Sequence, residues 1–139
     1  MEDTAILQTL QTAVIAAVAA YDPAMPIKAE GRTLDQVNGS LPTTYVEIVF
    51  IPNNRRGDFW GNEKNYRGML RIILHYPQDD AGAYPPMLAL AAICTPFDNG
   101  AVFGAVQIYG AADFMGKVEQ GHETLYPASL LYQSYHKGT

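Results

Sequence analysis

The strongest pattern of apolar and polar positions runs from Tyr66 to Phe97 and predicts a strand, a turn and a helix. Residues 66–76 are apolar on both alternating faces, with Arg71 and His75 as polar breaks. Such a run is typical of a strand that is covered on both sides. Pro77 ends this strand, because proline removes a backbone donor. After a polar turn, a helix is predicted over 84–97, and its apolar face consists of Met87, Leu90, Ala91 and Cys94.

A second helix is predicted over Thr4–Tyr21, where apolar residues recur at helical spacing. Its start is capped by Asp3 or Thr4, and Pro23 follows its end. The predicted buried face consists of Leu7, Leu10, Val14, Ala17, Val18 and Tyr21.

The opposite face of this helix is small, neutral and free of charge, since no charged residue falls between Asp3 and Asp22. Its members are Gln8, Gln11, Thr12, Ile15 and Ala19. Solvated helix faces usually carry Lys and Glu, so this composition suits contact with another chain. An Ala-rich surface face that contacts nothing explains the same residues equally well, because exposed small residues are common.

The remaining strands are predicted from shorter apolar runs, at 27–30, 44–51, 101–109 and 125–135. Pro127 places an edge or a bulge near the start of the last strand. Residues 22–42 read as a long connection, and 110–123 show no clear periodicity. The chain is therefore expected to be one α+β domain over 1–139. We expect a mainly antiparallel sheet of four to five strands, with two helices packed on one face.

The connection Asn53–Asn65 is longer than a tight hairpin and combines basic with bulky aromatic residues. Long structured loops tend to be functional, and Trp and Arg are enriched at the energetic centres of protein interfaces. We interpret Arg55, Arg56, Phe59 and Trp60 as interface residues. The alternative is that Phe59 and Trp60 fold back onto the edge of the sheet.

Composition excludes several classes of function. The formal charge of −5 and a pI near 5.0 argue against a dedicated nucleic-acid binder, which needs a basic surface. The single cysteine excludes an internal disulfide framework and a multi-cysteine metal site. A signal peptide is not expected, because the leader is acidic. The uninterrupted apolar run is far shorter than the roughly 20 residues that cross a bilayer.

No catalytic constellation is found in the sequence. His75, His122 and His136 lack the spacing of metal ligands. Cys94 lies on an apolar helix face, where a buried inert thiol is expected rather than a nucleophile. Asp79 and Asp80 could bind a cation, but two acidic residues in a turn more often serve only to keep the turn in contact with water. We therefore expect no cofactor, no metal and no enzymatic activity.

The order of elements and several short motifs resemble the tail-terminator-like proteins of long-tailed bacteriophages, of the lambda type. The resemblance rests on the Ala- and Leu-rich first helix, the YVEIVFIP strand and the 66–97 segment. It continues through the strands NGAVFGAVQIYG and LYPASLLYQSY. Matching motif positions are Arg67-Gly68, Tyr76-Pro77, Gly82, Phe97 and Tyr126-Pro127. The chain departs from the family pattern in the loop 55–64 and in residues 111–121.

This resemblance implies a virion structural protein without catalytic activity. It implies a homo-oligomeric ring, a hexamer in this family, that caps the tail tube protein and joins the tail to the head-side connector protein. DNA would pass through the lumen without specific binding, and an acidic lumen suits its sliding. Two alternatives remain open: a head-completion or connector protein, and a small-molecule-binding α+β domain with its pocket between helices and sheet.

Overall fold

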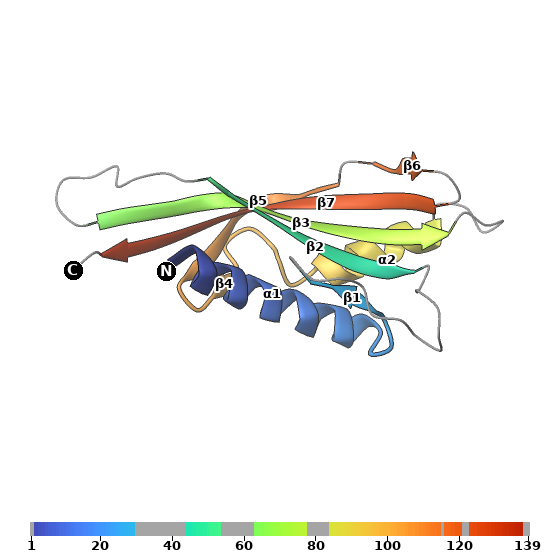
Figure 1. Cartoon of the computed structure of the whole chain (residues 1–139), viewed down its shortest axis with the longest axis horizontal. Helices are drawn as coiled ribbons and strands as arrows, with labels where there is room; N and C mark the ends of the chain where they lie inside the picture. The colour runs from blue at the N-terminus through green and yellow to red at the C-terminus, as the bar shows by residue number, and fades with distance from the viewer. Residues whose placement is uncertain are drawn as a thin grey trace.

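The computed structural model describes residues 2–29, 44–53, 63–77, 84–114, 116–120 and 123–137. In chain order the elements are α1 (Glu2–Tyr21), β1 (Ile27–Lys28), β2 (Tyr45–Asn53), β3 (Glu63–Pro77), α2 (Tyr84–Cys94), β4 (Val102–Phe103), β5 (Val106–Phe114), β6 (Val118–Gln120) and β7 (Glu123–Lys137). Both helices lie on one side of a single twisted sheet (Figure 1). The predicted α+β class is confirmed.

The sheet follows the order β1-β2-β3-β7-β5-β4, and β6 pairs with β7 beyond the end of β5. The β1–β2 pair is parallel and the other pairs are antiparallel, so the sheet is mixed. It also has seven strands, more than the predicted four to five. The two long central strands, β3 and β7, pair over their full length, whereas β2 begins to pair with β3 only at Arg67. One end of the β3–β7 pair therefore projects beyond the other strands (Figure 1).

The core lies between the helices and the inner face of the sheet. α1 contributes Ile6, Leu10, Val14, Ala17 and Val18. The sheet contributes Val46, Ile48, Leu70, Ile72, Leu74, Val106, Ile108, Ala128, Leu130 and Tyr132. Alternate residues of β2, β3 and β7 point to this layer, which is the period-two pattern of a sheet with one covered face.

The buried faces of the two helices agree in part with the predicted ones, since Leu10, Val14, Ala17 and Val18 of α1 and Leu90 and Cys94 of α2 are buried as expected. In α1, Ile6 takes the buried position expected for Leu7, which is half-buried, and Tyr21 is 45% exposed. In α2 the buried residues are Ala89, Leu90, Ile93 and Cys94, whereas Met87 and Ala91 are exposed. α2 is apolar nearly all round and α1 carries only neutral side chains between Asp3 and Asp22, so helical spacing does not fix the edges of the buried face, and packing against the sheet decides them.

The prediction that β3 is covered on both faces is wrong for the part of the chain that the structure describes. Both helices lie on one side of the sheet (Figure 1), and Leu70, Ile72 and Leu74 are the fully buried alternate residues of β3. On the opposite face, called the open face below, the neighbours Arg71 and Ile73 are half-buried. Long side chains on adjacent strands shield one another there, so the apolar run does not require a second layer.

The region 101–120 was also predicted incorrectly, because a hairpin replaces a single strand. Gly104, at a φ of +59°, turns the chain between β4 and β5, a conformation that favours glycine. β5 then continues to Phe114, with a register shift between Tyr109 and Asp113. The alternation of residue types along the chain continues through the tight turn between β4 and β5. The sequence pattern therefore gives no sign that the predicted strand is interrupted there.

Pro127 lies in a central strand, so the predicted edge position is wrong. On the β5 side of β7, however, the last pair with β5 is Phe114↔Ala128 and the first pair with β6 is Val118↔Leu125. Pro127 falls between these two pairs, where no partner in register is found on that side among the described residues. A gap in strand pairing is a position at which the missing backbone donor of a proline is tolerated.

Candidate interaction surfaces

The outer face of α1 is a neutral surface that points away from the core. Gln8, Thr12 and Ala19 are exposed, Gln11 is half-buried, and Ile15 is 41% exposed. The structure thus brings the five predicted residues of α1 together on one face. Thr4–Tyr21 is also long and apolar enough to cross a membrane by length and composition alone, with a mean hydropathy of 1.4. Core helices of soluble proteins pass the same test, and α1 contributes five residues to this core.

A second surface is an apolar groove between α2 and the ends of β5 and β7, called the α2–β5 groove below. Its cavity is about 220 Å³ and is lined by Met87, Leu90, Ala91, Phe114, Gly116, Lys117, Tyr126 and Pro127. Met87 is 53% exposed and Phe114 is 48% exposed. Gly116, at a φ of +78°, redirects the chain between β5 and β6, and the groove opens where β5 ends.

The α2–β5 groove carries little net charge. Lys117 is the basic residue among the described residues of the lining, and its Nζ lies 3.1 Å from Glu119 Oε1 in an exposed ion pair. Large apolar side chains that stay in contact with water are typical of a docking site for another molecule. The sequence predictions missed this surface, because residues 110–123 show no periodicity and the groove joins them to α2 only through tertiary contacts.

A third concavity lies on the open face, where the two central strands meet β2 and β5. It is about 460 Å³ and is lined by Ile51, Pro52, Arg67, Gly68, Met69, Tyr109 and Leu131. Ile51 and Leu131 are each 40% exposed. Arg67 gives this concavity a cationic component, and the nearby Arg71 Nε is buried without a hydrogen bond within the described residues. This surface is therefore apolar and basic, in contrast to the neutral face of α1.

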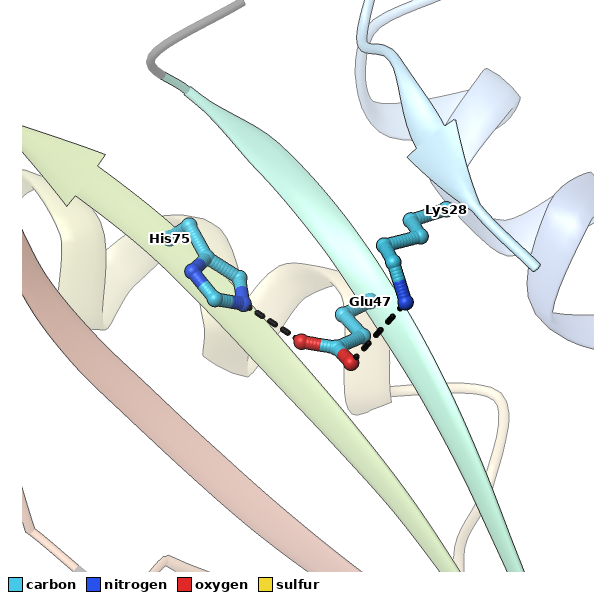
Figure 2. Close-up of polar contacts among 3 residues, drawn as sticks. All are labelled: Lys28, Glu47 and His75. Carbon is cyan, nitrogen blue, oxygen red and sulfur yellow. Dashed lines mark hydrogen bonds and ion pairs between the residues drawn. The ribbon is translucent and has the colours of Figure 1, made fainter. Parts of the chain in front are cut away.

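A polar network joins three neighbouring strands at one edge of the open face (Figure 2). His75 Nε2 lies 2.7 Å from Glu47 Oε1, and Lys28 Nζ lies 3.4 Å from Glu47 Oε2. The Tyr45 ring stacks on the imidazole at a centroid distance of 4.1 Å. His75 is buried. The carboxylate thus bridges β1 and β3, and the network fixes the short edge strand to the sheet.

Removal of the bridging carboxylate is expected to destabilise the fold. We expect Glu47→Ala to lower the free energy of unfolding by about 1–3 kcal/mol, because a buried ring loses a hydrogen-bonding partner. Glu47→Gln, which keeps a side-chain oxygen and the side-chain volume, should lose less. Urea unfolding followed by circular dichroism measures both. Equal losses in the two variants would show that the hydrogen bond to His75 contributes nothing.

The candidate reactive residues do not form a site within the described residues. Burial raises the pKa of the Cys94 thiol to about 12, which keeps it protonated and unreactive at neutral pH. Across the described ranges, no group of three or more His, Cys, Asp or Glu side chains could hold a metal ion. Asp79, Asp80, Arg55, Arg56, Phe59, Trp60 and His122 lie outside the described residues, as does the side chain of His136.

The geometry defines a class of fold: a mixed sheet with two helices on one face and an opposite face that the helices leave open. No protein-family profile matches the sequence, and no curated protein matches it. Solved structures do share the fold. A protein whose function is not stated is similar with a TM-score of 0.73 and 19% identity, over 93% of this chain and 92% of that chain.

A second similar structure is a chain of the virion of a native gene transfer agent particle. Its TM-score is 0.57 and its identity 18%, over 93% of this chain and 95% of that chain. In both comparisons nearly the whole of each chain takes part. At these identities the likeness establishes a shared fold.

Proposed function

We propose that this chain is a structural protein of a phage-like virion and that it acts as a tail terminator. The observation that carries the proposal is the fold shared with a chain of a gene transfer agent virion over 93% of this chain. The motifs at Arg67-Gly68, Tyr76-Pro77 and Tyr126-Pro127 add separate support, because they point to the same class of particle through residue identity rather than through backbone shape.

The surfaces of the molecule suit a protein whose function is contact with other proteins. An exposed, charge-free helix face and an exposed apolar groove lie on the same chain. Burial of neutral surface avoids the cost of desolvating charges, so such surfaces favour stable association. A third surface, the basic and apolar concavity of the open face, differs in chemistry from both and offers a place for a different partner.

In the proposed role the chain forms a ring, a hexamer by the family resemblance, at the head-proximal end of the tail. One side of the ring contacts the tail tube protein and the other contacts the head-tail connector protein. DNA passes through the lumen without specific binding, which agrees with a chain of net charge −5. The role requires no catalysis, no cofactor and no membrane. A head-completion protein of the same fold is the alternative.

Deletion of the gene from the genome that encodes the particle tests this function. Loss of a terminator should give filled heads and separate tails, many of them abnormally long, in electron micrographs. Loss of a head-completion protein should instead give tails of normal length and unjoined or leaking heads. If purified virions lack the protein and the purified chain is monomeric across a concentration series, the proposal is wrong.

A further inference from the structure

The open face of the sheet keeps four large hydrophobic side chains in contact with water. Ile51 and Leu131 are each 40% exposed, Val118 is 51% exposed and Val102 is 63% exposed. Each of them pairs in register with a residue that points away from the helices, so the four lie on one face of four different strands. Exposed apolar side chains that gather on one face are typical of a surface that another protein covers.

Arg71 lies near the centre of the open face and has no anionic partner among the described residues. Its Nε is buried without a hydrogen bond, and its Nη2 makes only a weak contact, 3.8 Å from Sδ of Met69. A guanidinium has five N–H donors and binds a carboxylate through two parallel hydrogen bonds. Part of its hydration is already lost in the single chain, so a carboxylate from outside the chain would bind Arg71 at a reduced desolvation cost.

An exposed carboxylate lies in the same row of the sheet. Arg71 pairs in register with Ser129 of β7, and Ser129 pairs in register with Asp113 of β5. Arg71 and Asp113 therefore lie on opposite sides of β7, two strand spacings or about 10 Å apart. Asp113 is exposed and has no ion pair with another described residue. β7 thus has a positive position on one side and a negative position on the other, at equal distances.

We propose that two copies of the chain pack their open faces together about a two-fold axis that runs close to β7. Such an axis exchanges the two sides of β7, so Arg71 of each copy faces Asp113 of the other. In the neighbouring row, Leu131 meets its own counterpart and Met69 faces Tyr109, because these three residues pair in register. One symmetry operation therefore produces two ion pairs, an apolar contact on the axis and a sulfur–aromatic contact.

The other charged groups of the open face fit the same arrangement. Arg67 faces Gln107 of the other copy, whose amide oxygen accepts a bond from Gln133 and can accept a second. Glu47 and Lys28 lie on β2 and β1, in the rows beyond the end of β5. The axis therefore leaves their ion pair at the rim of the contact, where water still reaches it.

This contact goes beyond the proposed function and does not depend on it. It is isologous, so it joins two copies and does not by itself extend into a ring. α1 lies on the other side of the sheet (Figure 1), so its outer face stays available for a ring contact.

A cysteine beside the axis tests the contact on the full-length protein. Leu131→Cys should react with a short bismaleimide to give a crosslinked dimer on a denaturing gel. The native Cys94 is buried and its thiol has a pKa of about 12, so the wild-type chain should not crosslink. Leu88→Cys, at an exposed leucine of α2 on the helix side, is the matched control and should stay monomeric on the gel. Gln133→Cys, two residues along β7 on the same face, replaces Leu131→Cys if that variant fails to fold.

Charge reversal in the Leu131→Cys background separates this contact from an ion pair within one chain. Arg71→Glu alone and Asp113→Arg alone each place like charges opposite one another, so each should lower the crosslinked fraction roughly tenfold or more. A mixture of the two variants should restore the crosslink, because in that heterodimer each position 71 again faces the opposite charge at position 113. An ion pair within one chain cannot restore it, since neither variant chain holds opposite charges at the two positions.

The outcomes distinguish the contact from the proposed function. A Leu131→Cys crosslink that is lost in each charge variant and returns in the mixture supports the contact. If Arg71→Glu does not fold, loss of the crosslink in Asp113→Arg supports it. A missing crosslink in both β7 variants, or a crosslink that charge reversal leaves unchanged, overturns the contact and leaves the terminator role intact. The gene deletion tests that role separately, and its result leaves the crosslinking result unchanged.

Discussion

Gly68→Ala is expected to lower the free energy of unfolding by about 3 kcal/mol, through overpacking in the centre of the sheet. A Cβ atom on Gly68 would lie 2.7 Å from the backbone oxygen of Ile51 and 2.7 Å from Cζ of Tyr132. Tyr132 pairs in register with Gly68, is fully buried and stacks on Phe50 at a centroid distance of 5.5 Å. Neither a strand backbone nor a buried ring can move without disturbing its own neighbours. Chemical unfolding measures the loss.

Gly116→Ala is the control for this effect. Gly116 has a φ of +78°, and a Cβ atom added to it would meet no atom of the described residues within 4 Å, its chain neighbours apart. Alanine should therefore cost only about 1 kcal/mol of backbone strain there. The larger loss at Gly68 would then come from contacts. Equal losses at the two sites would show that the sheet relaxes around the added methyl group, and that the close packing of Tyr132 over Gly68 does not contribute to stability.

Ile15→Glu is expected to abolish ring assembly while the isolated subunit keeps its stability. Ile15 is 41% exposed on the charge-free face of α1, and glutamate is a good helix former. The change in unfolding free energy should therefore stay within about 0.5 kcal/mol. A charge buried in an apolar subunit interface should cost about 2 kcal/mol or more at each contact, or roughly a 30-fold weaker association. Mass photometry across a concentration series measures the assembly, and thermal unfolding of the monomer measures the fold.

Ala16→Glu is the matched control for Ile15→Glu. It places the same charge on the next residue of α1, about 100° around the helix and at an exposed position. Assembly should fall much less in this variant. Equal loss of assembly in both variants would argue for general repulsion between acidic chains rather than a specific contact at Ile15. Loss of monomer stability in Ile15→Glu would assign Ile15 to the core instead.

The local elements followed largely from the sequence. Helical spacing and flanking prolines located both helices, and α1 ends at Tyr21 as predicted. Apolar runs located the strands at β1, β2, β3 and β7. These features are predictable because they depend on the spacing of apolar side chains and on residues that lack a backbone N–H donor or favour a turn. The candidate residues on α1 were grouped correctly for the same reason, since helical geometry alone puts them on one face.

The interaction surfaces beyond α1 could not be found in this way. The α2–β5 groove joins Met87, Phe114 and Tyr126, which are far apart in the sequence. They meet because β7 lies in the middle of the sheet and β5 ends beside Pro127. Only the strand order and register bring these side chains together, and neither is encoded in a local pattern.

Local residue patterns were sufficient for the class of fold, the location of most elements and the neutral character of α1. Three-dimensional packing was needed to establish the limits of the buried face of each helix, where the strand at 101–109 folds back, and that Pro127 lies in a central strand. The physical reason is the same in each case. Periodicity and turn chemistry act within a few residues, whereas burial is a free energy shared among segments that meet only after the sheet has formed.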